Sequence, residues 1–206
     1  MLSRTQIRWI GILTMIGGAI WAVSWTLNVL FTQDGSQAVL GLSERGWRTL
    51  LNPALLFFIA GLTGHQLRSA RRLRTLGKIG FVTSLVGLVA MLVGNVIEWW
   101  IDERGGGMML IGFFILWIGL ILLGIAHLNA KLLFGWRRIL PLSIGLVPLV
   151  LLLLAVVARL LVDVRSAELL LLLMLYAFAL GWIALGYDLW SSTLEEPNAN
   201  AVKPQI

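Results

Sequence analysis

The chain has no cysteine and little charge. Only 13% of its 206 residues are Asp, Glu, Lys or Arg, against about 25% in an ordinary globular protein. The missing cysteines exclude a disulfide scaffold and thiol chemistry. Hydrophobic residues make up 59% of the chain and the mean hydropathy is +0.91. Because apolar runs of about 20 residues recur throughout, lipid must be the solvent for most side chains. The sequence therefore predicts an integral membrane protein, and it excludes a soluble nucleic-acid-binding protein despite a pI near 10.8.

Six segments are long enough to cross about 30 Å of hydrocarbon at about 1.5 Å per residue. They are residues 8–30, 49–65, 79–100, 108–128, 139–158 and 167–190. The predicted fold is therefore an all-α integral membrane bundle of six transmembrane helices, which three αα-hairpins could build. We expect residues 1–191 to form this single transmembrane domain and residues 192–206 to form a solvated tail. Whether the hairpins are a true repeat stays open.

Lys and Arg are unevenly distributed among the loops. If the N-terminus is cytoplasmic, most of the 16 Lys and Arg residues lie on the cytoplasmic side, as the positive-inside rule requires. An even number of spans then places the C-terminus on the same side. We expect a multi-pass protein with both termini in the cytoplasm.

Small residues follow one another at helical spacing along the third segment. They are Gly80, Ser84, Gly87 and Gly94. Helices in lipid associate through close van der Waals fit, so a stripe of small residues predicts that a neighbouring backbone packs on this face. The neighbour can belong to the same chain, to a second copy in a homo-oligomer, or to a larger membrane complex.

Two stretches carry a resemblance. Residues 57–94, FFIAGLTGHQLRSARRLRTLGKIGFVTSLVGLVAMLVG, and residues 120–150, LILLGIAHLNAKLLFGWRRILPLSIGLVPLV, resemble small uncharacterised six-span bacterial inner-membrane proteins. The resemblance implies the fold class and a bacterial plasma membrane as the location. It carries over no activity and no functional residue.

The only two histidines, His65 and His127, fall at corresponding ends of the second and fourth segments. They should lie at similar depth, with glycines nearby. Imidazole nitrogens from two helices can take both axial positions of one b-type haem, and glycines leave room for the ring. An interfacial position near the helix carbonyl ends is the more ordinary interpretation.

Glu98 ends the third segment, close to Asp102, Glu103 and Arg104. An ionisable residue inside a membrane is by default a functional-site hypothesis. A solvated outer rim, with Glu98 paired to Arg104, is the structural alternative to a cation or proton site. Elsewhere the segments are expected to hold only neutral polar groups.

Five basic residues gather between the second and third segments. They are Arg68, Arg71, Arg72, Arg74 and Lys78. Such a cluster attracts anionic lipid headgroups at about 1 kcal/mol per charge, and it can equally serve only to fix the topology. Membrane lipids, with anionic headgroups on the cytoplasmic side, are therefore the expected partners, and no nucleic acid is expected.

The chain lacks the H-E-x-x-H, G-x-S-x-G and G-x-x-x-x-G-K patterns of common catalytic and phosphate-binding sites. We therefore expect no enzymatic activity and no metal. The leading hypothesis is an accessory, scaffold or lipid-interacting membrane subunit. The rival is a small-molecule transporter or channel whose pore is lined by Asn28, Asn52, Asn95 and Tyr176.

Overall fold

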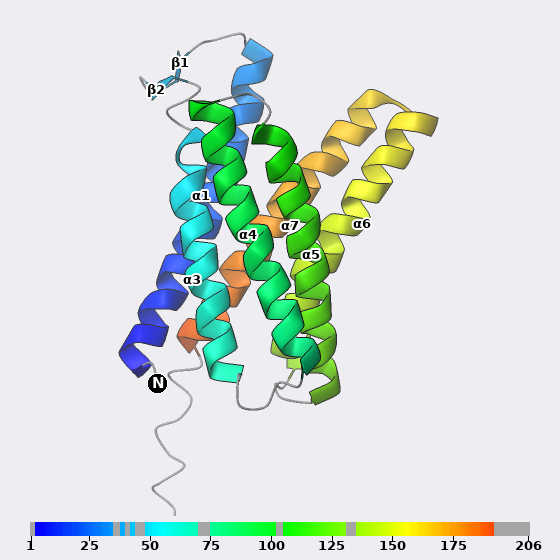
Figure 1. Cartoon of the computed structure of the whole chain (residues 1–206). Coiled ribbons are helices and arrows are strands. Elements are labelled where there is room, and N and C mark those ends of the chain that lie inside the picture. The colour runs from blue at the N-terminus through cyan, green and yellow to red at the C-terminus, as the bar shows by residue number, and fades with distance from the viewer. Residues whose placement is uncertain are drawn as a thin grey trace, which may run out of the picture.

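The computed structural model describes residues 3–34, 38–39, 42–43, 48–69, 75–101, 105–130 and 135–191 (Figure 1). Within these residues the chain forms six α-helices, which confirms the predicted all-α bundle. They are α1 (Arg4–Asp34), α3 (Leu51–Ser69), α4 (Thr75–Trp100), α5 (Gly105–Ala130), α6 (Leu140–Leu161) and α7 (Val164–Ser191). A short 3-10 helix, η1 (Gly135–Arg138), precedes α6. Strands β1 (Ala38–Val39) and β2 (Leu42–Ser43) pair antiparallel.

The helices are long for the bilayer. Among the described residues, five of them (α1, α4, α5, α6 and α7) are long and apolar enough to cross a membrane. The sixth, α3, has 19 residues and packs beside α1 and α4. Most helices extend a turn or so beyond the apolar segments, as α4 does by starting at Thr75 rather than at residue 79. Helical hydrogen bonding continues beyond the apolar segment, so hydropathy alone does not locate the ends of the helices.

The six helices form a closed ring in chain order. Each helix packs on the next one along the chain, α7 returns to α1, and α7 also contacts α3. The start of α1 and the ends of α3, α5 and α7 lie together at the bottom of Figure 1, which we call the N-terminal end of the bundle. The top, where the α6–α7 connection lies, is the opposite end.

Aromatic side chains fill the middle of the ring. Trp21, Phe58, Phe178 and Trp182 are at most 1% exposed. Phe58 stacks on Trp182 with ring centroids 4.4 Å apart, and Trp21 meets Phe178 edge-on at 5.3 Å. These are favourable aromatic geometries. The aromatic cluster therefore separates the two ends of the bundle.

The small stripe of α4 faces α5 of the same chain. A Cβ built on Gly87 would lie 2.4 Å from the Leu116 nitrogen, and one on Gly80 would lie 2.5 Å from the Leu123 nitrogen. Gly94 approaches α5 as closely, and Ser84 turns its hydroxyl onto its own helix, 2.8 Å from the Gly80 oxygen. Only residues without a large side chain allow two backbones to come this near.

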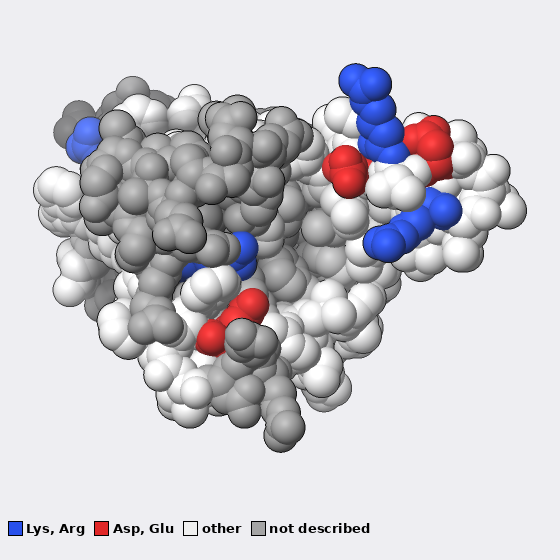
Figure 2. Space-filling model, turned by 90° about the horizontal axis from the view of Figure 1, so that it is seen from above, with Lys and Arg blue, Asp and Glu red and all other residues white. Residues whose placement is uncertain are grey.

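The α6–α7 connection carries charges of both signs. Figure 2 shows acidic and basic side chains gathered on this tip. Arg159, Asp163, Arg165 and Glu168 are all exposed there. Asp163 begins α7 as its N-terminal cap, because the Ser166 backbone N–H donates to the Asp163 carboxylate at 2.7 Å. This bond, together with the bond from the Ser166 hydroxyl, lowers the pKa of Asp163.

Candidate functional site

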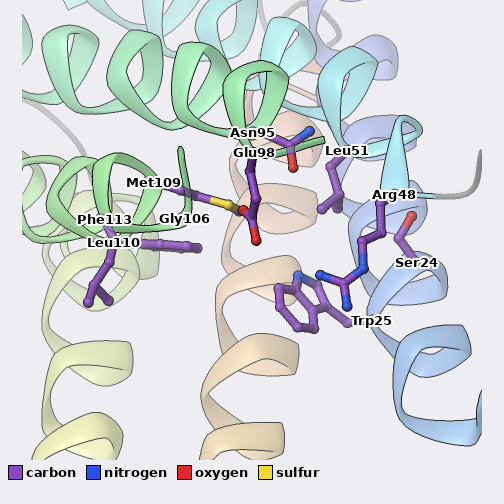
Figure 3. Close-up of a pocket in the computed structure, with 10 residues that line it drawn as sticks. All are labelled: Ser24, Trp25, Arg48, Leu51, Asn95, Glu98, Gly106, Met109, Leu110 and Phe113. Atoms are coloured by element: carbon purple, nitrogen blue, oxygen red, sulfur yellow. The ribbon is translucent and has the colours of Figure 1, made fainter. Parts of the chain in front are cut away.

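A cavity of about 230 Å³ lies inside the ring towards the opposite end, and we call it the polar chamber (Figure 3). Residues from α1, α4 and α5, from the start of α3 and from the segment just before α3 surround it. It is lined by Ser24, Trp25, Arg48, Leu51, Asn95, Glu98, Gly106, Met109, Leu110 and Phe113. Several of these side chains are polar although they lie within the bundle.

The chamber lining contains buried polar atoms without a hydrogen-bond partner in the described part of the chain. They include the Ser24 hydroxyl, the Trp25 indole nitrogen and Asn95 Oδ1. Ser24 and Asn95 are each only 1% exposed. Asn95 Nδ2 donates to Asn52 Oδ1 at 2.7 Å, which leaves Oδ1 as the unsatisfied end of the amide. Buried polar groups are normally paired, so atoms left without a partner around a cavity indicate a place for a polar ligand or for water.

The chamber also holds two opposite charges. Glu98 is half-buried, and none of the side-chain hydrogen bonds or ion pairs among the described residues involves its carboxylate. The Arg48 guanidinium lies over the Trp99 ring, 4.2 Å from its centroid, a cation–π geometry. The residues predicted to surround Glu98 on a solvated rim, Asp102, Glu103 and Arg104, lie outside the described residues. The carboxylate itself contributes to the wall of a cavity.

Two glycines at the start of α5, Gly105 and Gly106, leave space beside the Glu98 side chain. The first turn of α5 fits so closely against the last turns of α4 that a Cβ on Gly105 would lie 2.1 Å from the Glu98 nitrogen. A Cβ on Gly106 would lie 3.2 Å from Glu98 Oε1. A larger residue at either position would push the two helices apart or displace the carboxylate.

A second, larger cavity of about 620 Å³ adjoins the chamber, and we call it the apolar cleft. It lies between α5 and the α6–α7 pair, where these two helices lean away from the rest of the bundle (Figure 1). Its lining comprises Trp25, Leu110, Phe113, Trp117, Leu152, Glu168, Leu171, Leu172, Met174 and Leu175. Trp25, Leu110 and Phe113 line both cavities, so they form the boundary between a polar space and an apolar one.

Comparison with known protein families, with curated proteins and with solved structures finds no match to this chain. The function therefore has to be argued from the geometry of the site.

The two histidines meet near the N-terminal end of the bundle. The His65 and His127 ring centroids are 4.9 Å apart, and the two side chains are 1% and 0% exposed. His127 Nδ1 lies 2.8 Å from the Leu123 oxygen. Two axial ligands of a haem lie on opposite faces of the macrocycle, with the iron between them, whereas these rings are at the contact distance of adjacent aromatic groups. The arrangement does not fit a haem held between the two rings.

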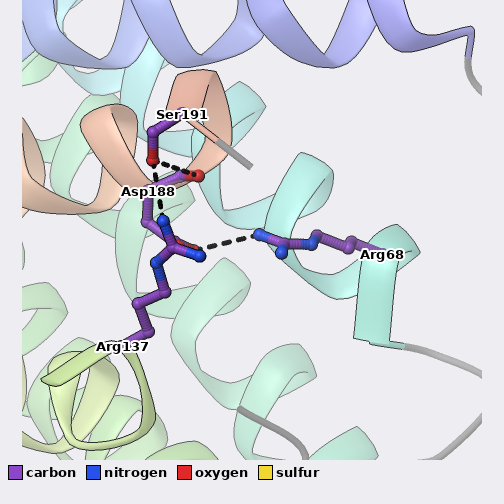
Figure 4. A network of polar contacts seen from close by, with 4 residues as sticks. All are labelled: Arg68, Arg137, Asp188 and Ser191. Carbon is purple, nitrogen blue, oxygen red and sulfur yellow. Dashed lines mark hydrogen bonds and ion pairs between the residues drawn. The ribbon is translucent and has the colours of Figure 1, made fainter. Parts of the chain in front are cut away.

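An ion centre around Asp188, a residue that hydropathy did not single out, lies close to the histidines. Figure 4 shows its side chains. Asp188 of α7 is fully buried and pairs with Arg68 of α3 at 3.3 Å and with Arg137 of η1 at 3.1 Å. Arg137 also donates to the Ser191 hydroxyl at 3.1 Å. The expectation of only neutral polar groups elsewhere in the segments is therefore wrong. Asp188 falls inside the segment 167–190, and its isolation there is the signal that could have found it.

The predicted basic cluster is only partly described. Arg68 donates to Asp188 and so helps to hold α3 against α7. Lys78 is exposed on the first turn of α4. Arg71, Arg72 and Arg74 lie outside the described residues, so their role as lipid headgroup ligands stays a prediction.

Of the described residues expected to line a pore, Asn95 lines the chamber, whereas Asn52 and Tyr176 line neither of the two cavities. Asn52 and Asn95 bond to each other, and Asn95 alone of the two lines the chamber. The Tyr176 hydroxyl bonds to the Thr26 hydroxyl at 2.6 Å. The side chain of Asn28 lies outside the described part.

Proposed function

We propose that this chain is a non-enzymatic membrane protein that binds a membrane lipid, with an acyl chain in the apolar cleft and the headgroup in the polar chamber. The observation that carries the proposal is the junction of the two cavities. A space lined by leucine, methionine and aromatic residues adjoins one lined by Ser24, Asn95 and Glu98. An amphiphile has this same division into an apolar and a polar part.

The dimensions and position of the cleft favour a lipid chain. Its volume of about 620 Å³ falls within the range of about 300–1,000 Å³ usual for small-molecule sites. Leu110, which lines it, is 53% exposed in the bundle. In a membrane this exposed surface faces hydrocarbon, so an acyl chain can enter sideways without crossing water.

The rival function, a transporter or channel, receives less support. The aromatic cluster of Trp21, Phe58 and Trp182 fills the ring between the chamber and the histidine pair. Close-packed aromatic rings leave no aqueous path in this arrangement. A transported solute would require these side chains to move apart.

We place the protein in a bacterial plasma membrane with both chain termini in the cytoplasm. This assignment rests on the resemblance to six-span bacterial proteins and on the positive-inside rule. The chamber then lies in the outer leaflet, and the N-terminal end of the bundle, with Arg68 and Lys78, faces the anionic cytoplasmic leaflet.

A pair of neighbouring substitutions tests lipid binding. Leu172 lines the cleft, whereas Leu173 does not line it and is 55% exposed. Leu172→Trp places an indole where the acyl chain would lie, so most of the phospholipid that co-purifies in mild detergent should be lost. Leu173→Trp adds the same side chain to the outer face and should retain it. Mass spectrometry of extracted lipid per protein measures the difference, with thermal melting to verify folding. Equal lipid retention by two folded variants would rule the cleft out as a lipid site.

A further inference from the structure

We infer that the polar chamber selects lipids whose headgroup carries a primary ammonium group beside a phosphate, as in a phosphoethanolamine headgroup. This inference rests on the proposed lipid binding and names the chemistry that the chamber recognises. It is argued from the Glu98 carboxylate, from the unpartnered polar atoms beside it, and from the Arg48 guanidinium.

The charge of Glu98 favours a cationic ligand. Glu98 contributes a negative charge to a cavity within the bundle, and no cation among the described residues pairs with it. A carboxylate taken partly out of water is costly unless a cation or several hydrogen bonds compensate it. A ligand that brings its own positive charge supplies that compensation. An uncharged or purely anionic headgroup does not.

The chamber also offers several hydrogen-bond acceptors. Glu98 provides carboxylate oxygens, Asn95 Oδ1 is an acceptor without a partner, and the Ser24 hydroxyl can accept as well. A primary ammonium has three N–H donors and no acceptor, so three acceptor groups around one cavity match it. A quaternary ammonium such as choline has no N–H to donate, and it would leave these atoms unsatisfied.

The Arg48 guanidinium adds a cation to the chamber lining. Arg48 lies over Trp99, which orients its guanidinium plane, and a planar guanidinium suits the oxygens of a phosphate. The Trp25 indole N–H, which has no partner among the described residues, is a second kind of donor at the boundary with the cleft. A phosphate between the ammonium group and the acyl chains would meet these donors, which makes the chamber complementary to both charges of the headgroup.

The experiment compares headgroups at constant acyl chains. The purified protein is exposed to equal amounts of palmitoyl-oleoyl phosphatidylethanolamine, phosphatidylcholine and phosphatidylglycerol, and the bound lipids are counted by native mass spectrometry. We expect phosphatidylethanolamine to be preferred by about tenfold or more, as one charge-assisted hydrogen bond implies. Glu98→Gln preserves shape and removes the charge, so the preference should disappear while total lipid binding remains.

Asp163→Asn is the matched control. Asp163 is an exposed carboxylate on the α6–α7 connection and lines neither cavity, so the same change of charge there should leave the preference intact. If Asp163→Asn removes the preference and Glu98→Gln does not, the headgroup lies at the tip, and the assignment to the chamber fails. If folded Glu98→Gln keeps the wild-type preference, the inference is overturned while the cleft remains a lipid site. Loss of lipid binding is tested separately by Leu172→Trp.

A soluble ligand is the remaining alternative source of this chemistry. Glycerophosphoethanolamine carries the same headgroup without acyl chains. We expect it to displace the lipid only at far higher concentration, because the cleft contributes much of the affinity through apolar contact. Displacement at equal concentration would show that the chamber binds a soluble amine, and the lipid assignment would fail.

Discussion

At the scale of single residues, the buried charge of Asp188 has to be compensated by other side chains. It is fully buried, and the two arginines that pair with it come from α3 and η1. Desolvating the carboxylate costs several kcal/mol, which the paired guanidinium groups offset. The ion centre therefore joins segments far apart in the chain at the N-terminal end of the bundle.

We predict that Asp188→Asn lowers the free energy of unfolding by about 3 kcal/mol, because it leaves two partly buried guanidinium groups without their anion. Asp163→Asn is the control, since Asp163 is exposed and Asn is also a good helix cap, so its effect should stay within about 0.5 kcal/mol. Thermal or denaturant unfolding in detergent measures both. Similar losses for the two variants would mean that the ion centre contributes little to stability.

At the scale of helices, close backbone contact holds α4 against α5. Gly80, Gly87 and Gly94 meet the α5 backbone at a distance that no larger side chain permits. Leu88, the next residue after Gly87, is itself fully buried, so the packed face of α4 is wider than the glycine stripe. The same helix pair carries Glu98 and Gly106, and its spacing sets the width of the polar chamber.

We predict that Gly87→Leu destabilises the protein by about 1 to 3 kcal/mol through overpacking against Leu116. Val86→Leu is the control, because Val86 precedes Gly87 on the same helix and is 52% exposed. It should melt within about 0.5 kcal/mol of the parent. If the two variants melt alike in detergent, α5 does not depend on this contact. A change of particle mass in Gly87→Leu alone would show that the stripe also joins two copies of the chain.

The whole molecule is a ring that is tightly packed at its centre and open at one side. Aromatic rings fill the middle, and the polar chamber and the apolar cleft lie towards the end at which α6 and α7 lean outwards. A bundle of this form can admit a lipid from the side while remaining closed along its axis. This arrangement agrees better with lipid binding than with conduction.

The orientation of the bundle can be tested with cysteines, since the parent chain has none. We predict that Ser69→Cys, at the end of α3, labels only from the cytoplasm, and that Ser36→Cys, between the first two predicted spans, labels from outside intact cells. A membrane-impermeant maleimide distinguishes the two sides. External labelling of the Ser69→Cys variant would reverse the topology and place the chamber in the inner leaflet.

Hydropathy along the chain is sufficient to predict the class of the protein and the relative depth of its side chains. Hydropathic length is a local property, so the apolar segments, the all-α fold and the glycine stripe could be predicted without knowing any neighbour. The similar depth of His65 and His127 followed from the same reasoning. The haem interpretation needed the spacing of the two rings, which depth alone does not give.

Which side chains meet depends on the packing of the helices. Position along the chain fixes the height of a residue in the bilayer, whereas its neighbours around the helix axis depend on how all the helices pack. Arg68 and Asp188 are 120 residues apart in sequence, and Ser24 and Glu98 reach one chamber from α1 and α4. Apolar helices in lipid have no strong hydrophobic preference for one partner over another. The chamber, the cleft and the ion centre therefore follow from the packing of the ring, which no single segment of this sequence contains.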